Sequence, residues 1–77
     1  MKKEYVEVLA EFGVDGKLTP KSIRWIDGTM YDIDRVLEVK QCASLKVGGF
    51  GTRYKVRIRG EETYIFYEFD KWFVERK

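Results

Sequence analysis

Hydrophobic and polar residues alternate most regularly in the stretch from residue 53 to residue 59. Apolar side chains occupy every second position and cations occupy the others: Tyr54, Val56 and Ile58 against Arg53, Lys55, Arg57 and Arg59. A period of two is typical of a β-strand with one buried face. The pattern therefore predicts a strand that turns its apolar residues toward a core and its four cations toward solvent.

Similar alternation predicts strands on either side of this one. The stretch Tyr5–Phe12 places four side chains on its buried face: Val6, Val8, Ala10 and Phe12. Thr63–Phe69 is predicted to return antiparallel after a tight loop at Gly60-Glu61 or at Glu61-Glu62. Either loop puts Ile65, Tyr67 and Phe69 on the core side, and it puts Tyr64 and Phe66 beside the cations. A second turn at Asp70-Lys71 leads into a closing strand, Trp72–Glu75.

Asp27-Gly28 is the strongest hairpin signal in the chain, and it separates Ser22–Ile26 from Thr29–Ile33. A two-residue loop would set Trp25 opposite Met30 and Arg24 opposite Tyr31. We expect Ile23, Trp25 and Met30 in the core. Upstream, Asp15-Gly16 predicts another turn, and Thr19-Pro20 predicts a break because proline lacks a backbone donor.

The stretch Asp34–Val47 is compatible with two structures. Its β-branched residues favour a strand, whereas Asp34 as an N-cap and apolar residues at helical spacing favour a helix. We favour a strand to about Ala43, because neighbouring short strands offer it an edge to pair with. Gly48-Gly49-Phe50-Gly51 then predicts a flexible loop.

Short extended stretches with turn signals every eight to twelve residues predict an all-β fold in a single domain, residues 1–77. We expect a small antiparallel barrel or a strongly curled sheet of about 6–7 strands. Aromatic residues make up 16% of the 77 positions, and each buried ring removes roughly 150 to 250 Å² from water. One compact core is therefore feasible.

The single cysteine, Cys42, excludes an intramolecular disulfide, and no Cys/His spacing suggests a zinc site. We expect a cytoplasmic protein, since a free thiol survives there and Glu4, Glu7 and Glu11 interrupt any leader-like apolar segment. No segment approaches the roughly 18 apolar residues of a membrane span, so we expect no membrane partner. The lack of histidine removes the commonest acid-base group, and we expect neither catalysis nor a cofactor.

Net charge is only +2, but residues 39–60 hold six cations and no acid. Cations alternating with aromatic rings are typical of surfaces that neutralise a nucleic-acid backbone while bases stack on the rings. The candidate nucleic-acid-binding residues are Arg53, Lys55, Arg57, Arg59, Phe50 and Tyr64. The alternative for this surface is a solvated strand face on which Glu62 or Glu68 pairs with the cations. The alternative function is a protein-interaction module or homodimer that uses an open sheet edge or an aromatic patch.

The order of turn and aromatic residues resembles a family of short, uncharacterised bacterial all-β proteins. The resemblance rests on a proline, a Trp-centred hairpin, an Arg-Tyr strand and an aromatic closing strand: Pro20, Ile23, Trp25, Asp27-Gly28, Tyr31, Ile33, Val36, Arg53-Tyr54 and Trp72-Phe73-Val74-Glu75. It implies an accessory bacterial protein, in some cases with genes near those of DNA-repair polymerases. It assigns no catalytic residue.

Overall fold

The computed structural model describes residues 2–43 and 50–76, and these form one sheet of seven antiparallel strands. The strands are β1 Lys2–Phe12, β2 Leu18–Arg24, β3 Met30–Asp32, β4 Arg35–Ala43, β5 Phe50–Ile58, β6 Glu61–Glu68 and β7 Lys71–Arg76. Their order in the sheet is β3-β2-β1-β7-β6-β5-β4. The all-β prediction is confirmed, and so is the strand to Ala43. Residues 44–49 of the predicted segments lie outside the described residues.

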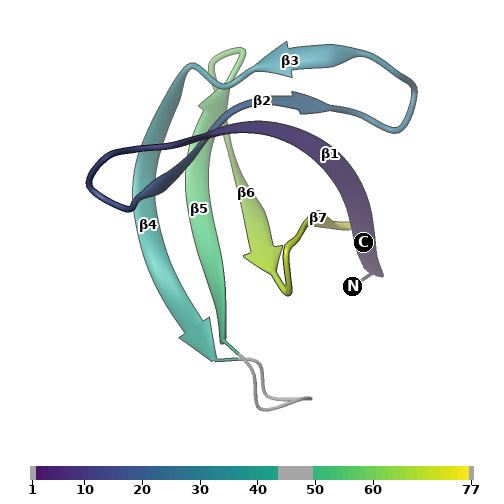
Figure 1. The fold of residues 1–77 in the computed structure, drawn as a ribbon. Coiled ribbons are helices and arrows are strands. Elements are labelled where there is room, and N and C mark those ends of the chain that lie inside the picture. The colour runs from purple at the N-terminus through teal and green to yellow at the C-terminus, as the bar shows by residue number, and fades with distance from the viewer. Residues whose placement is uncertain (1, 44–49, 77) are drawn as a thin grey trace.

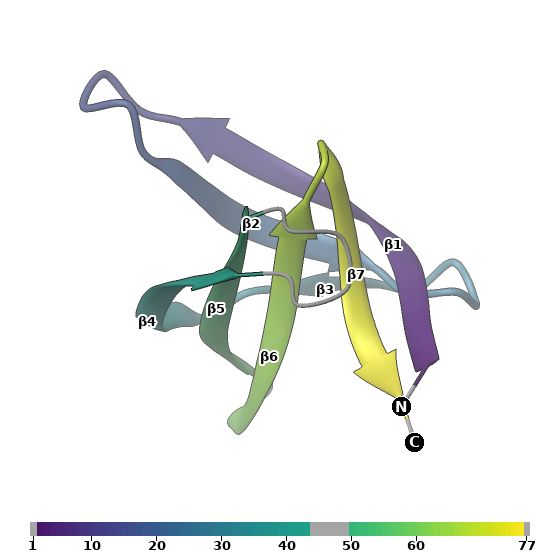
Figure 2. The same cartoon turned by 90° about the horizontal axis from the view of Figure 1, so that it is seen from below.

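The sheet curls into a half-barrel, so β1 and β2 arch across the concave side of β4–β7 (Figure 1). Figure 2 shows the same arch from below, with the β1–β2 hairpin reaching past the other strands. β3 and β4 are the two ends of the strand order. Of the two predicted forms, the structure is therefore the curled open sheet.

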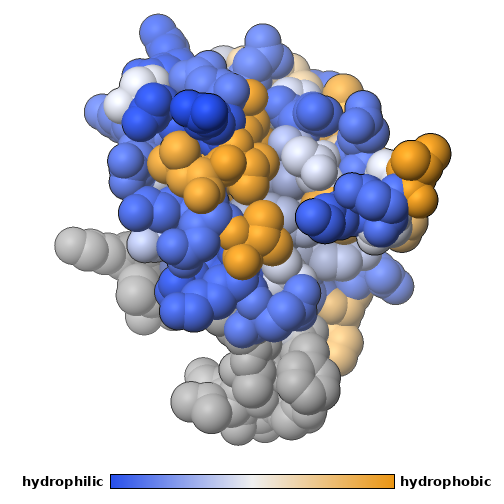
Figure 3. Space-filling view, turned by 90° about the vertical axis from the view of Figure 1, so that its left-hand side faces the viewer, coloured by the Kyte–Doolittle hydropathy of each residue, from blue (hydrophilic) through white to orange (hydrophobic). Residues whose placement is uncertain are grey.

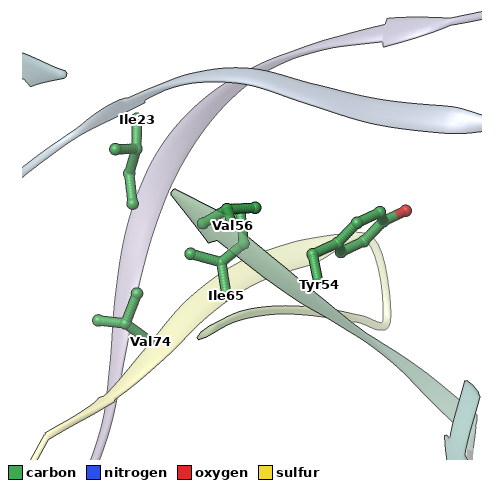
Figure 4. Packing of buried hydrophobic residues seen from close by; sticks show 5 residues of the cluster. All are labelled: Ile23, Tyr54, Val56, Ile65 and Val74. Atoms are coloured by element: carbon green, nitrogen blue, oxygen red, sulfur yellow. The ribbon is translucent and has the colours of Figure 1, made fainter. Parts of the chain in front are cut away.

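The core lies on the concave side, where strands from the two walls face each other. Its buried members come from four strands: Ile23, Tyr54, Val56, Ile65 and Val74. Figure 4 shows Ile23 reaching from β2 toward the side chains of β5, β6 and β7. Val56 and Ile65 have no exposed surface, and burying such a side chain contributes about 1.5 to 3 kcal/mol. The alternation that predicts an inward-facing β5 is confirmed.

The β1–β2 hairpin differs from the sequence prediction at two points. Pro20 does not break the chain, because β2 continues through it at a register shift opposite Leu9 and Ala10. A bulge of this kind tolerates a missing backbone donor. Phe12, predicted in the core, is 73% exposed because it lies near the tip of the hairpin, beyond the opposing wall.

The β2–β3 hairpin has a longer loop than the predicted two residues. The Trp25 N–H donates a hydrogen bond to the Thr29 carbonyl, and the Gly28 N–H donates one to the Trp25 carbonyl. The extra loop residue shifts the register by one, so that Met30 pairs with Arg24. A one-residue shift exchanges the faces of a strand. Met30 is therefore exposed, and the prediction that it lies in the core is wrong, whereas that for Ile23 is confirmed.

The two C-terminal hairpins turn earlier than predicted. The β5–β6 loop is Arg59-Gly60, since Ile58 pairs with Glu61, and the β6–β7 loop is Phe69-Asp70. All four loop residues have positive φ, the geometry of the two-residue loops that match strand twist. Arg59 and Phe69 consequently leave their predicted strand positions. At the other end of β5, Phe50 and Gly51 belong to the strand and not to the predicted loop.

Candidate nucleic-acid interface

The outer face of β5 carries three of the four predicted cations. Tyr54 and Val56 are 4% and 0% exposed on the concave side. Because neighbouring residues of a strand point to opposite faces, Arg53, Lys55 and Arg57 lie on the convex side. The opposite residues of β6 are Phe66, Tyr64 and Glu62, in that order. The predicted sharing of this face by cations and aromatic rings is confirmed.

Carboxylates lie beside two of these cations. The Lys55 Nζ is 3.3 Å from the Glu62 Oε1, and this hydrogen bond and charge raise the pKa of Lys55 above its usual range. The Arg53 Nη2 is 3.8 Å from the Glu38 Oε1 on β4. Both acids are half or more exposed, and exposed pairs of this kind contribute about 0 to 1 kcal/mol. The cross-strand pairing by Glu62 that sequence reasoning offered as the alternative is therefore present.

Arg57 is placed differently, because its direct neighbour on β4 is another arginine. Arg35 and Arg57 are opposite residues of the β4–β5 ladder, and within residues 2–43 and 50–76 neither forms an ion pair. The acid across from Arg57 on β6, Glu62, bonds Lys55 instead. Like charges directly opposite each other destabilise a sheet. This arginine pair, which sequence reasoning missed because it needs the β4–β5 register, is a site where an anion would relieve repulsion.

Tyr64 supplies an accessible ring next to these cations. Its side chain is 42% exposed, and the Arg53 guanidinium lies 4.8 Å from the ring centroid. A guanidinium over a ring is attracted by the ring's negative face. One cation and one aromatic surface are thereby held together on the convex side.

Of the remaining two candidate residues, Arg59 lies apart from this group. Arg59 sits in the β5–β6 turn with φ 53°, and its guanidinium lies 5.9 Å from the centroid of the Tyr31 ring. It lines the concave side and not the outer face. Phe50 begins β5, but its side chain lies outside the described residues.

A second aromatic group covers the convex side of β1, β6 and β7. Phe73 stacks on Phe66 with centroids 5.1 Å apart, and Tyr5 meets it edge-on at 5.9 Å. The Lys3 Nζ lies 4.7 Å from the Phe73 centroid and 3.2 Å from the Glu68 Oε1. Phe73 is thus buried, but on the face opposite the main core. The alternation of Trp72, Phe73 and Val74 is the sequence signal for that placement.

On the concave side, a groove of about 540 Å³ opens where the two walls of the half-barrel diverge. Ile23, Ile65 and Val74 form its floor, and Arg59 and Glu61 lie among its charged lining residues. Sequence reasoning did not find it, because it depends on how far the sheet curls.

Comparison with known proteins does not assign a function. No protein-family model matches the chain, and neither a curated protein nor a solved structure is significantly similar to it. Within the part of the chain that the structure describes, no three Cys, Asp or Glu side chains gather as metal ligands. The described residues also include no helix long and apolar enough to cross a membrane.

Proposed function

We propose that the convex face of β4 and β5 binds nucleic acid, with single-stranded chains as the preferred form. The observation that carries the proposal is the Arg35–Arg57 pair, two arginines at opposite positions of the β4–β5 ladder that have no carboxylate partner among the described residues. A phosphate between them would replace repulsion with two charge-assisted hydrogen bonds. The guanidinium group suits this role because its planar donors match phosphate oxygens.

The charges around the pair extend the site. The convex face of β4 and β5 holds five cations and one acid: Arg35, Lys40, Arg53, Lys55, Arg57 and Glu38. The bonds of Glu38 and Glu62 to their partners are solvent-exposed and weak. A polyanion can therefore compete for Arg53 and Lys55 at little cost.

Tyr64 supports single strands over duplexes. An exposed ring accepts an unpaired base by stacking, which contributes about 1 to 3 kcal/mol per base. Bases inside a duplex are already stacked on each other and do not present their faces. The neighbouring Arg53 would then contact the phosphate of the stacked nucleotide.

Fluorescence anisotropy with labelled single-stranded DNA and RNA oligonucleotides tests the proposal. We expect binding at low salt and a Kd that rises with salt, with a log-log slope of about 0.7 per phosphate contacted. Four contacts would give a slope of about 3. Absence of binding at low salt, or a Kd indifferent to salt, would refute the proposed function.

A further inference from the structure

β4 is a nine-residue strand at one end of the sheet, and β5 is its neighbour in the strand order. A strand in this position presents backbone donors and acceptors along its outer edge. Val39 lies at its midpoint. Its β5 partner is Tyr54, which is only 4% exposed, yet Val39 itself is 56% exposed. Figure 3, which views the molecule from the β4 side, shows orange apolar patches among mostly blue hydrophilic surface.

We propose that two copies of this chain associate through β4, with the two β4 strands pairing antiparallel about a two-fold axis at Val39. The pairing would cover each Val39 with its counterpart and continue the sheet from one copy into the other. A two-fold axis of this kind makes every contact occur twice. The inference concerns assembly and does not depend on nucleic-acid binding.

The charges of β4 select this register. Opposite residues in a continuous antiparallel sheet share a face. The two-fold axis must therefore lie at a residue, and near the midpoint of β4 the possible residues are Glu38, Val39 and Lys40. An axis at Glu38 opposes two glutamates, and an axis at Lys40 opposes two lysines. An axis at Val39 instead sets Glu38 of each copy opposite Lys40 of the other.

The Glu38–Lys40 pairing also limits which registers the edge strand β4 can adopt with a second copy. Charged residues and bulges on edge strands normally oppose uncontrolled pairing, and β4 has a register shift between Val36 and Glu38. The segment from residue 38 to residue 41 lies beyond that shift. Its charges disfavour the neighbouring registers and leave one favourable pairing, which is a closed dimer and not an open fibre.

The dimer would also enlarge the basic surface. With the two-fold axis perpendicular to the sheet, the convex faces of both β4–β5 pairs lie on the same side. The Arg35–Arg57 pairs of the two copies would then border one continuous surface.

Charge exchange tests the register by light scattering over a concentration series. We expect the wild-type chain to approach twice its monomer mass. Glu38→Lys and Lys40→Glu should each weaken dimerisation about tenfold, because each opposes like charges twice. An equimolar mixture of the two variants should dimerise again, since the lysine introduced in one variant would meet the glutamate introduced in the other. The double exchange in one chain should do the same. A strictly monomeric wild-type chain, or single variants that dimerise as the wild type does, would overturn the proposal.

Disulfide trapping gives an independent readout. In a Cys42→Ser background, Val39→Cys should form a covalent dimer under mild oxidation, because opposite Cα atoms lie about 4.5 to 5.5 Å apart. Gln41→Cys is the matched control, since its two copies would lie about 13 Å apart along the strands. Equal cross-linking of the two variants, checked as folded by circular dichroism, would exclude the Val39 axis.

Discussion

At the scale of single residues, Tyr54 joins the two walls of the half-barrel. Its ring is 4% exposed, and its hydroxyl donates a 2.7 Å hydrogen bond to the Leu18 carbonyl of β2. Burial is the main cause that raises the pKa of this phenol. The hydroxyl therefore belongs to the packed interior, and its removal leaves the Leu18 carbonyl without that donor.

Tyr54→Phe should lower the free energy of unfolding by about 1 kcal/mol and the Tm by about 4 to 8 °C. Urea denaturation measures the change. Tyr67→Phe is the matched control, because the Tyr67 hydroxyl donates to the Asp70 carboxylate at an exposed site. A loss in the control as large as that in Tyr54→Phe would contradict the role of the inter-wall bond.

The same pair of variants has a pH signature. A tyrosine of the unfolded chain ionises near pH 10, whereas the pKa of folded Tyr54 is higher. The contribution of the protonated Tyr54 hydroxyl to the free energy of unfolding is therefore fully present below pH 10, and it is lost as the pH rises through the pKa that Tyr54 has in the folded chain. The free energy of unfolding of Tyr54→Phe should therefore fall less steeply at alkaline pH than that of the wild type. Part of the fall that remains in this variant should come from the Tyr67 hydroxyl, because its hydrogen bond to Asp70 raises the pKa of Tyr67.

Residue facing could be predicted from the sequence, but distant partners could not. The period of two places Tyr54 and Val56 inside and Lys55 outside, and the predicted return of the chain offers Glu62 or Glu68 as an acid that pairs with the cations. The acceptor of Tyr54 is 36 positions away along the chain. Its identity depends on the curl of the sheet, which no local pattern encodes.

At the scale of elements, the turns decide which face a residue occupies. Sequence reasoning found each hairpin, because glycine and aspartate mark the turns, but it misplaced the β2–β3, β5–β6 and β6–β7 loops by one or two residues. The errors at the β5–β6 and β6–β7 loops leave every strand residue on its predicted face of the sheet. The third, at Asp27-Gly28, adds a loop residue and exchanges the face of β3, because Gly28 alone has positive φ there and Asp27 accepts a 2.9 Å bond from the Thr29 N–H.

The β6–β7 turn holds a bulky residue in a strained conformation. Phe69 has φ 53° and is 62% exposed, so it combines left-handed backbone with little packing. Asparagine tolerates this conformation far better.

Phe69→Asn should therefore raise the free energy of unfolding by about 1 kcal/mol, measured by urea or thermal denaturation. Phe12→Asn is the matched control, because Phe12 is similarly exposed but lies on a strand without positive φ. Equal effects of the two substitutions would show that backbone strain at Phe69 is not the cause.

At the scale of the whole molecule, the half-barrel separates two surfaces with different chemistry. The concave side holds the core and the groove, and the convex side of β4–β5 holds the cations. Composition and turn spacing predicted a curled all-β sheet. They could not predict which acids return to neutralise the cations, because Glu38 reaches Arg53 through the β4–β5 register.

The opposed arginines are the feature on which the functional account depends most. Arg35→Gln/Arg57→Gln removes two cations from the proposed site and relieves their repulsion, so the variant should be at least as stable as the wild type. Lys17→Gln/Lys21→Gln is the matched control, because it removes the same charge from β2 and its turn.

The most direct measurement is the salt dependence of oligonucleotide binding by these two double variants, recorded by fluorescence anisotropy. We predict that the arginine variant binds more weakly and that its log-log salt slope falls by about 0.7, corresponding to the loss of the one phosphate held between the two arginines. The lysine variant should keep the wild-type slope. Identical slopes and affinities for the two double variants would contradict binding through the convex face of β4 and β5.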